Sequence, residues 1–175
     1  MLSFRELLGY ADRLYEDAKE QCHHGSADPY IIGSILNSWM AIESFINNMM
    51  QDFASLPEDM FNIHERGFLV EKQVRFQSKG KKAGTFMVEK NAEFKRLEDK
   101  ILFLIAKFGK SSCVDKGTKI WQEFEDMKNK RNYLSHPKKD EEFALTINDA
   151  LDSINTAKAI INLVSIEVWK KPVKW

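Results

Sequence analysis

The sequence predicts an all-α fold, a helical bundle of about five to six helices. Apolar residues recur three and four positions apart in six successive segments, and a helix places residues at that spacing on one face. Capping residues stand at the start of most segments, and no alternation of strand and helix patterns is visible along the chain. We therefore expect one helical domain over residues 1–175, with a basic loop at about 78–90 and a short tail at 170–175.

Local signals bound the predicted helices. They span about residues 3–22, 30–53, 55–77, 91–108, 118–135 and 146–169. Their caps are short polar side chains, some with an acidic residue three positions later or a proline next: Ser3 with Glu6, Asp28 with Pro29, Ser55 with Glu58, Thr118, and Thr146 with Asp149. Residues 85–88 read either as an extended piece or as the lead-in to the next helix. The tail is expected to fray.

Composition limits the function. The 26 basic and 26 acidic residues cancel, so the chain lacks the overall cationic field that drives strong non-specific binding to nucleic acid. Any contact with RNA must come from local patches. Cys22 and Cys113 form neither a disulfide framework nor a zinc-binding spacing, and no apolar run approaches the length of a membrane span. We expect a soluble cytoplasmic protein with no membrane segment.

One basic segment stands out from this balance. Residues 71–84 contain five basic residues and one acidic residue. Lys79, Lys81 and Lys82 are candidates for a loop that follows an RNA backbone, because lysines neutralise phosphate charge. The alternative is an ordinary solvated loop.

A polar cluster ends the fifth predicted helix, where residues 128–137 read KNKRNYLSHP. Arg131 supplies a permanent planar cation that matches a phosphate group, and histidine, here His136, is the side chain whose unperturbed titration brackets neutral pH. Pro137 disfavours helical backbone at the residue before it, so the helix is expected to stop at about residue 135. Asn132 lies one turn before His136 and would orient its ring.

The motif Arg131-Asn132-x-x-x-His136 resembles the Arg-x4–6-His signature of HEPN domains, including the polar residue after the arginine. An apolar helix that carries one carboxylate, Glu43, and the segment 121–124 before the motif agree with this resemblance, which covers about residues 3–170. Many HEPN proteins are metal-independent ribonucleases, often toxins, whose motifs meet across a homodimer, and others only bind or act as scaffolds. The resemblance therefore implies RNA as the substrate, a homodimer, and an antitoxin protein as a further partner.

The residue types suggest a division of roles at such a site. His136 would act as general acid or base, Arg131 would hold the phosphate and stabilise its charge, and Asn132 would orient the imidazole. Glu43 would pair with Arg131 or His136, because a buried carboxylate needs a partner, or it is solvated at the edge of its helix. The loop lysines are joined as candidate RNA contacts by Lys128 and Lys138.

Two other functions remain open. A HEPN-like module without catalysis would bind a nucleotide or a protein partner such as a nucleotidyltransferase-type antitoxin, and the net charge of zero favours this somewhat. A purely structural bundle would use its basic residues only to complement the dipole at a helix end.

No metal site and no cofactor is expected. Residues 22–24, Cys-His-His, have no evident third ligand and read as the last turn of a helix. The chain also lacks the motifs of hydride transfer, ATP hydrolysis and zinc chemistry.

Overall fold

The structure, a computed structural model, describes residues 2–21, 28–110, 114–136 and 144–175. Within these ranges it contains six α-helices and a two-stranded sheet, which confirms the predicted all-α bundle of five to six helices. The elements in chain order are α1 Phe4–Gln21, α2 Asp28–Ala54, the 3₁₀ helix η2 Glu58–Met60, α3 Ile63–Leu69, β1 Lys72–Phe76, β2 Phe86–Ala92, α4 Leu97–Phe108, α5 Lys119–Ser135 and α6 Ile147–Trp169.

The chain forms two compact units. The first comprises Met1–Phe45 and Ile105–Trp175, and the second comprises Ile46–Leu104. Because α2 and α4 each continue through a boundary, the division falls inside helices rather than in linkers. The sequence predicts one domain over residues 1–175, and nothing in its composition marks either boundary.

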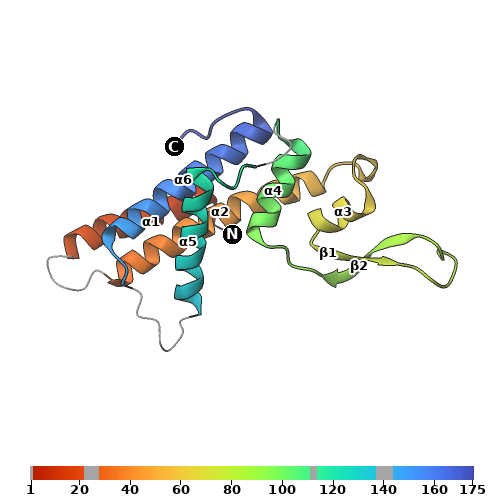
Figure 1. The fold of residues 1–175 in the computed structure, drawn as a ribbon, viewed down its shortest axis with the longest axis horizontal. Helices are drawn as coiled ribbons and strands as arrows, with labels where there is room; N and C mark the ends of the chain where they lie inside the picture. The colour runs from red at the N-terminus through yellow and green to blue at the C-terminus, as the bar shows by residue number, and fades with distance from the viewer. Residues whose placement is uncertain (1, 22–27, 111–113, 137–143) are drawn as a thin grey trace. The chain divides into compact units, whose positions relative to one another are not determined.

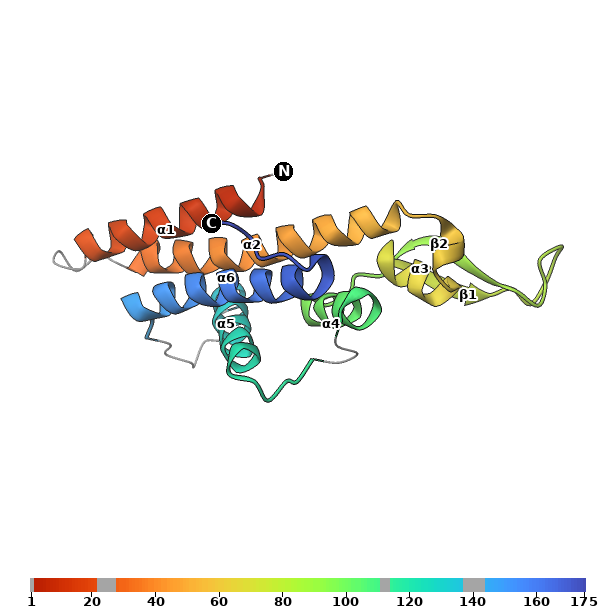
Figure 2. The same ribbon diagram turned by 90° about the horizontal axis from the view of Figure 1, so that it is seen from above.

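The first unit is a helical bundle. α1, the first part of α2 and α6 lie side by side, and α5 crosses them at a steep angle (Figure 1 and Figure 2). Apolar side chains at helical spacing build its core, among them Leu7, Leu8, Ile35, Ile42, Trp121, Phe124, Met127, Ile154, Ile161 and Val164. The predicted core face of the motif helix is therefore confirmed.

Two of the predicted capping boxes form. Ser3 N and Oγ donate to Glu6 Oε2 at 2.7 and 2.8 Å, and Thr146 N and Oγ1 both donate to Asp149 Oδ2 at 2.7 Å. The box predicted at Ser55 is wrong, since this residue follows the end of α2 and its hydroxyl donates to a carbonyl of that helix. α3 is capped instead by Asn62 together with Glu65.

The C-terminal tail is held against the first unit, contrary to the expected fraying. Arg5 Nη1 donates to Lys174 O at 2.6 Å, and the rings of Phe4 and Trp175 meet edge to face with centroids 6.4 Å apart. These contacts offset the entropy lost when a chain end is ordered.

The second unit contains a β-hairpin whose first strand lies where helix was predicted. Its second strand begins at Phe86, inside the basic loop predicted at about 78–90, and agrees with the extended alternative for residues 85–88. The helix expected over 55–77 is limited to α3, and the helix expected from residue 91 begins only at Leu97. Between them β1 and β2 pair antiparallel, with Val74 opposite Val88 and Phe76 opposite Phe86. Polar and apolar residues alternate in β1 over only four positions, from Gln73 to Phe76, and so short a pattern does not by itself exclude a helix. Contacts between side chains paired across the two strands stabilise the strand conformation of this segment relative to a helix.

Two features join the hairpin to the rest of its unit. A Cβ at Gly67 would stand 2.3 Å from Val74 Cγ2 and 3.1 Å from Lys72 O, so only glycine lets α3 lie this close to β1. Glu71 ends the turn after α3 with a left-handed φ of 50°. Its Oε1 forms an ion pair with Lys100 Nζ at 2.9 Å. The same ammonium donates to Asn47 Oδ1 at 2.9 Å.

Candidate functional site

The motif lies in the last turns of α5, and α5 ends at Ser135 as predicted. His136 is its C-cap, with φ −141° and ψ 63°, and its backbone N–H donates to Asn132 O at 2.9 Å. Pro137, on which the prediction rested, lies outside the described residues. The imidazole therefore projects from a helix end, where the backbone leaves the helical path.

A core contact anchors this helix end. Leu134 is partly buried and packs against a cluster that contains Ile31 and Ile35 of α2 and Ala150 of α6. Because Leu134 stands between Arg131 and His136 in sequence, its burial restricts the rotation of the whole last turn.

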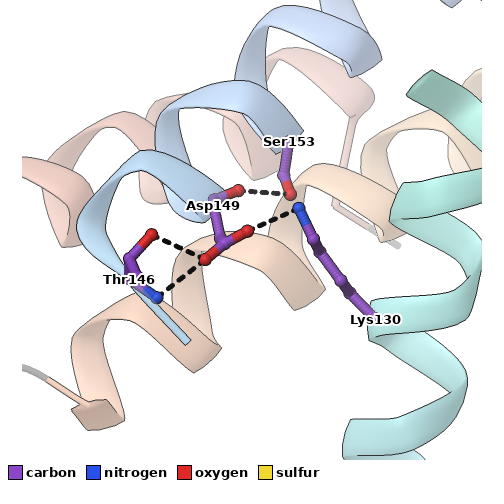
Figure 3. Close-up of polar contacts among 4 residues, drawn as sticks. All are labelled: Lys130, Thr146, Asp149 and Ser153. Atoms are coloured by element: carbon purple, nitrogen blue, oxygen red, sulfur yellow. Dashed lines mark hydrogen bonds and ion pairs between the residues drawn. The ribbon is translucent and has the colours of Figure 1, made fainter. Parts of the chain in front are cut away.

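An ion pair adds a second anchor, drawn in Figure 3. Lys130 Nζ reaches from α5 to Asp149 Oδ1 at 2.6 Å. Asp149 also closes the capping box with Thr146, and its backbone carbonyl accepts a hydrogen bond from Ser153 Oγ at 2.7 Å. Both side chains of the pair are 19% exposed, so water screens it less than a surface pair.

The electrostatics of Asp149 follow from these neighbours. Burial by itself raises the pKa of this carboxyl, but hydrogen bonds from Lys130 and Thr146 and the charge of Lys130 outweigh it. The net result is a pKa below the ordinary value for an aspartate. Asp149 is thus held in its charged form at the start of α6.

Arg131 lies over an aromatic ring. Its guanidinium carbon is 5.8 Å from the centroid of the Trp39 ring, which is the geometry of a cation–π contact. Trp39 belongs to α2, is 5% exposed, and stacks on Phe124 with centroids 5.5 Å apart and planes 10° from parallel. Phe124 and Arg131 are two turns apart on one face of α5, so both meet the same indole.

Glu43 reaches Arg131 only through this indole. Trp39 Nε1 donates to Glu43 Oε1 at 2.8 Å, and within the described residues Glu43 forms no ion pair with Arg131 or His136. A carboxylate that accepts the indole N–H makes the ring richer in electrons, which strengthens its attraction for a cation. Glu43 therefore contacts the indole N–H of Trp39, and Arg131 lies over the ring of the same residue.

The amide of Asn132 faces the arginine. Arg131 Nη1 donates to Asn132 Oδ1 at 3.2 Å, and the described structure contains no hydrogen bond between this amide and the ring of His136. Asn132 and His136 are both exposed. Asn132 thus orients the guanidinium.

The three cations near the motif differ in their partners. Lys128 pairs with Glu125 and Lys130 with Asp149, whereas Arg131 has no carboxylate partner among the described residues. An anion that approaches Arg131 would therefore not have to displace a described carboxylate, as it would at Lys128 or Lys130.

The other candidate lysines are placed as follows. Lys79, Lys81 and Lys82 are exposed in the connection between β1 and β2, in the second unit. Lys138 lies outside the described residues, as do Cys22, His23, His24 and Cys113.

Trp39 is the site residue that the sequence did not reveal. The four-residue spacing of Trp39 and Glu43 was visible and placed them on one stripe of a helix, but a contact with Arg131 joins positions 92 residues apart. The available signal was a tryptophan one turn before a lone carboxylate on an otherwise apolar helix.

Neighbouring surfaces of the first unit do not contain the motif pair. A polar groove of about 470 Å³ between α5 and α6 is lined by residues of both signs, among them Lys119, Glu123, Asp126, Lys130 and Asp152, and Arg131 and His136 are not part of its lining.

In the part of the chain that the structure describes, no group of three His, Cys, Asp or Glu side chains is arranged to hold a metal ion. No described helix is long and apolar enough to cross a membrane.

Comparisons of the chain with protein-family models, with curated proteins and with solved structures found no match in any of the three.

Proposed function

We propose that this protein is a HEPN-like endoribonuclease that needs no metal ion, with Arg131 and His136 acting in a cleft between two copies of the chain. It would act as the toxin of a toxin–antitoxin pair in the cytoplasm. RNA is the proposed substrate because the RNA supplies the attacking group, its own 2′-hydroxyl, and so demands little machinery from the protein.

One observation carries the proposal. Arg131 is held by Asn132 and lies over Trp39, without a carboxylate partner among the described residues. Five residues later the exposed His136 ends the helix. A positioned guanidinium and an accessible imidazole at one helix end are the two groups that phosphodiester cleavage requires.

The proposed reaction is an internal transfer. The bond between the 2′-oxygen and phosphorus forms as the bond from phosphorus to the 5′-oxygen breaks, and Arg131 stabilises the charge on the phosphoryl oxygens. A base accepts the proton of the 2′-hydroxyl, and an acid protonates the leaving 5′-oxygen. One histidine does not easily do both at one phosphate, so two copies would each contribute His136. The products are a 2′,3′-cyclic phosphate and a 5′-hydroxyl.

The other residues have supporting roles in this proposal. Asn132 orients the guanidinium, and Glu43 acts through Trp39. Lys79, Lys81 and Lys82 are exposed and have no carboxylate partner among the described residues, so they are free to contact the RNA backbone. Lys128 is engaged by Glu125 and would contribute less, and Lys138 is the remaining candidate.

The direct test is RNA cleavage in EDTA by purified protein, with the product ends identified chemically. We expect His136→Ala and Arg131→Ala each to lower the rate by about a hundredfold or more. Arg131→Lys should also be impaired, because an ammonium lacks the planar fork. Arg13→Ala, which removes an exposed arginine on α1, is the matched control and should cut at the wild-type rate.

The proposal fails if wild-type protein cuts no RNA under these conditions, or if His136→Ala cuts as well as wild type. A 3′-hydroxyl end on the product would also contradict it, because attack by the 2′-hydroxyl leaves a cyclic phosphate.

A second candidate is a HEPN-like module without catalysis that binds a nucleotide or a protein such as a nucleotidyltransferase-type antitoxin. The observation that favours it is that no described residue forms a hydrogen bond or ion pair with the imidazole of His136, so nothing described there sets its orientation. Expression in growing cells separates the two candidates. A ribonuclease toxin should arrest growth and Arg131→Ala should relieve the arrest, whereas a binding module should leave growth unchanged in both cases.

A further inference from the structure

The hairpin of the second unit carries a cluster of aromatic rings. Phe76 and Phe86 are directly opposite across the two strands, with ring centroids 5.3 Å apart. They are 51% and 49% exposed. His64, at the start of α3, places its ring 5.2 Å from Phe86 and at 59° to it. Single exposed apolar residues are common on proteins, but three clustered rings form a surface that can stack with a ligand.

A groove of about 470 Å³ adjoins this cluster and shares Phe86 with it. Its charged lining residues are Arg66, Lys72, Lys82 and Glu58, an excess of two positive charges. Arg66 is partly engaged, since it donates to Ala54 O and lies 4.0 Å from Glu58. Lys72 and Lys82 have no carboxylate partner among the described residues, so their charge is open to an anion.

The hairpin around the groove also carries a net positive charge. The hairpin from Lys72 to Ala92 contains six basic residues and one acidic residue, in a chain whose total charge is zero. The acidic residue, Glu89, is 3.6 Å from Arg75 and not part of the groove. Charge and exposed aromatic surface are therefore concentrated in one place.

We propose that this face of the hairpin binds a segment of single-stranded nucleic acid. Phe86 and Phe76 stack on unpaired bases, and Lys72 and Lys82 neutralise the phosphates beside them. A cationic groove with aromatic rings is the combination that binds single strands without sequence preference. A duplex does not fit it, because paired bases are already stacked on both faces. The site lies apart in sequence from Arg131 and His136, and the proposal does not depend on catalysis there.

Binding to a fluorescent thymidine oligodeoxynucleotide tests the proposal on the full-length protein. This DNA has no 2′-hydroxyl and so is not a substrate for the proposed cleavage, and binding is measured whether or not the protein is a nuclease. We expect Phe86→Leu and Phe76→Leu each to weaken binding about tenfold. Lys82→Gln should weaken it and reduce the slope of log affinity against log salt by about 0.7.

The matched controls lie in the same unit. Phe94 is 88% exposed but is not part of the cluster, and Lys90 is an exposed hairpin lysine outside the groove. Phe94→Leu and Lys90→Gln should bind as wild type does. All five substituted residues, the two controls included, have exposed side chains. Circular dichroism should therefore show every variant folded.

Three results would overturn the inference: no binding by wild type at low salt, equal affinity for a duplex of the same length, or equal losses in the control variants. Displacement of the oligonucleotide by polyglutamate at matched charge, with Phe86→Leu having no effect, would identify the groove as a site for acidic peptides instead.

Discussion

Among single side chains, Trp39 has the most connections at the candidate site. It receives Arg131 and Phe124 on its ring and donates its N–H to Glu43. A buried indole in this position holds the guanidinium of Arg131 at the end of α5 without neutralising it. An aspartate or glutamate there would also fix the arginine, but it would compete with any incoming phosphate.

A double-mutant cycle measures this contact. Trp39→Leu alone should lower the free energy of unfolding by about 3 kcal/mol, because a large buried ring is lost. Arg131→Met removes the charge and keeps most of the stem. The coupling energy between the two substitutions should be on the order of 0.5–2 kcal/mol, measured by urea unfolding.

The control cycle pairs Trp39→Leu with Arg13→Met, since Arg13 lies over Tyr10 instead. Its coupling energy should be close to zero. Equal coupling in the two cycles would mean that Trp39 does not hold Arg131.

Among the secondary-structure elements, the junction of α5 with the start of α6 decides where the motif lies. Lys130 and Leu134 fix the last turns of α5 from two sides, one by charge and one by apolar packing. The capping box of α6 and the anchor of α5 share one carboxylate, Asp149. A change at Asp149 therefore affects both helices.

This sharing predicts a pH dependence of stability. The pKa of Asp149 is lower in the folded protein than its ordinary value, so its contribution is fully present above the unfolded pKa of about 4. The contribution is lost as the pH falls through the lower, folded pKa. Asp149→Asn should lower the free energy of unfolding by about 1–2 kcal/mol at pH 7, and by less as the pH falls below 4.

Urea unfolding of wild type and variant between pH 3 and pH 7 checks this, and the two curves of stability against pH should converge at the acid end. Asp152→Asn is the control, because Asp152 is an exposed carboxylate on the same helix without an ion pair among the described residues. A constant difference between wild type and Asp149→Asn at every pH would contradict the assignment.

For the molecule as a whole, the proposed chemistry requires two copies of the chain. We expect light scattering at micromolar concentration to give the mass of a homodimer. Adding an excess of His136→Ala to wild-type protein should lower its cleavage activity, because a mixed dimer retains only one of the two imidazoles that the proposed reaction uses. A monomer under these conditions, or wild-type activity that an excess of His136→Ala leaves unchanged, would count strongly against a shared cleft.

The prediction of the fold from sequence succeeded where the signals are local. The starts of α5 and α6 were predicted at Thr118 and Thr146, and the end of α5 at about Ser135, from signals that act within one helical turn. Thr118 takes the N-cap position without a side-chain hydrogen bond to the helix, whereas Thr146 forms its capping box. The same reasoning failed at β1, where a hairpin depends on partners a dozen residues later in the chain. Gly67 was a missed indication, since a glycine within a short helix often marks a close backbone approach.

The candidate site, like the fold, was predictable only where its features depend on neighbouring residues. The presence of Arg131, Asn132 and His136 at a helix end could be read from the order of residues, because spacing along a helix and its termination are properties of neighbouring residues. The partners of those side chains could not. Folding of α2 against α5 brings Trp39 beneath the guanidinium, and pairing of two strands gathers Phe76, Phe86 and the groove lysines, because such contacts depend on which distant segments pack together.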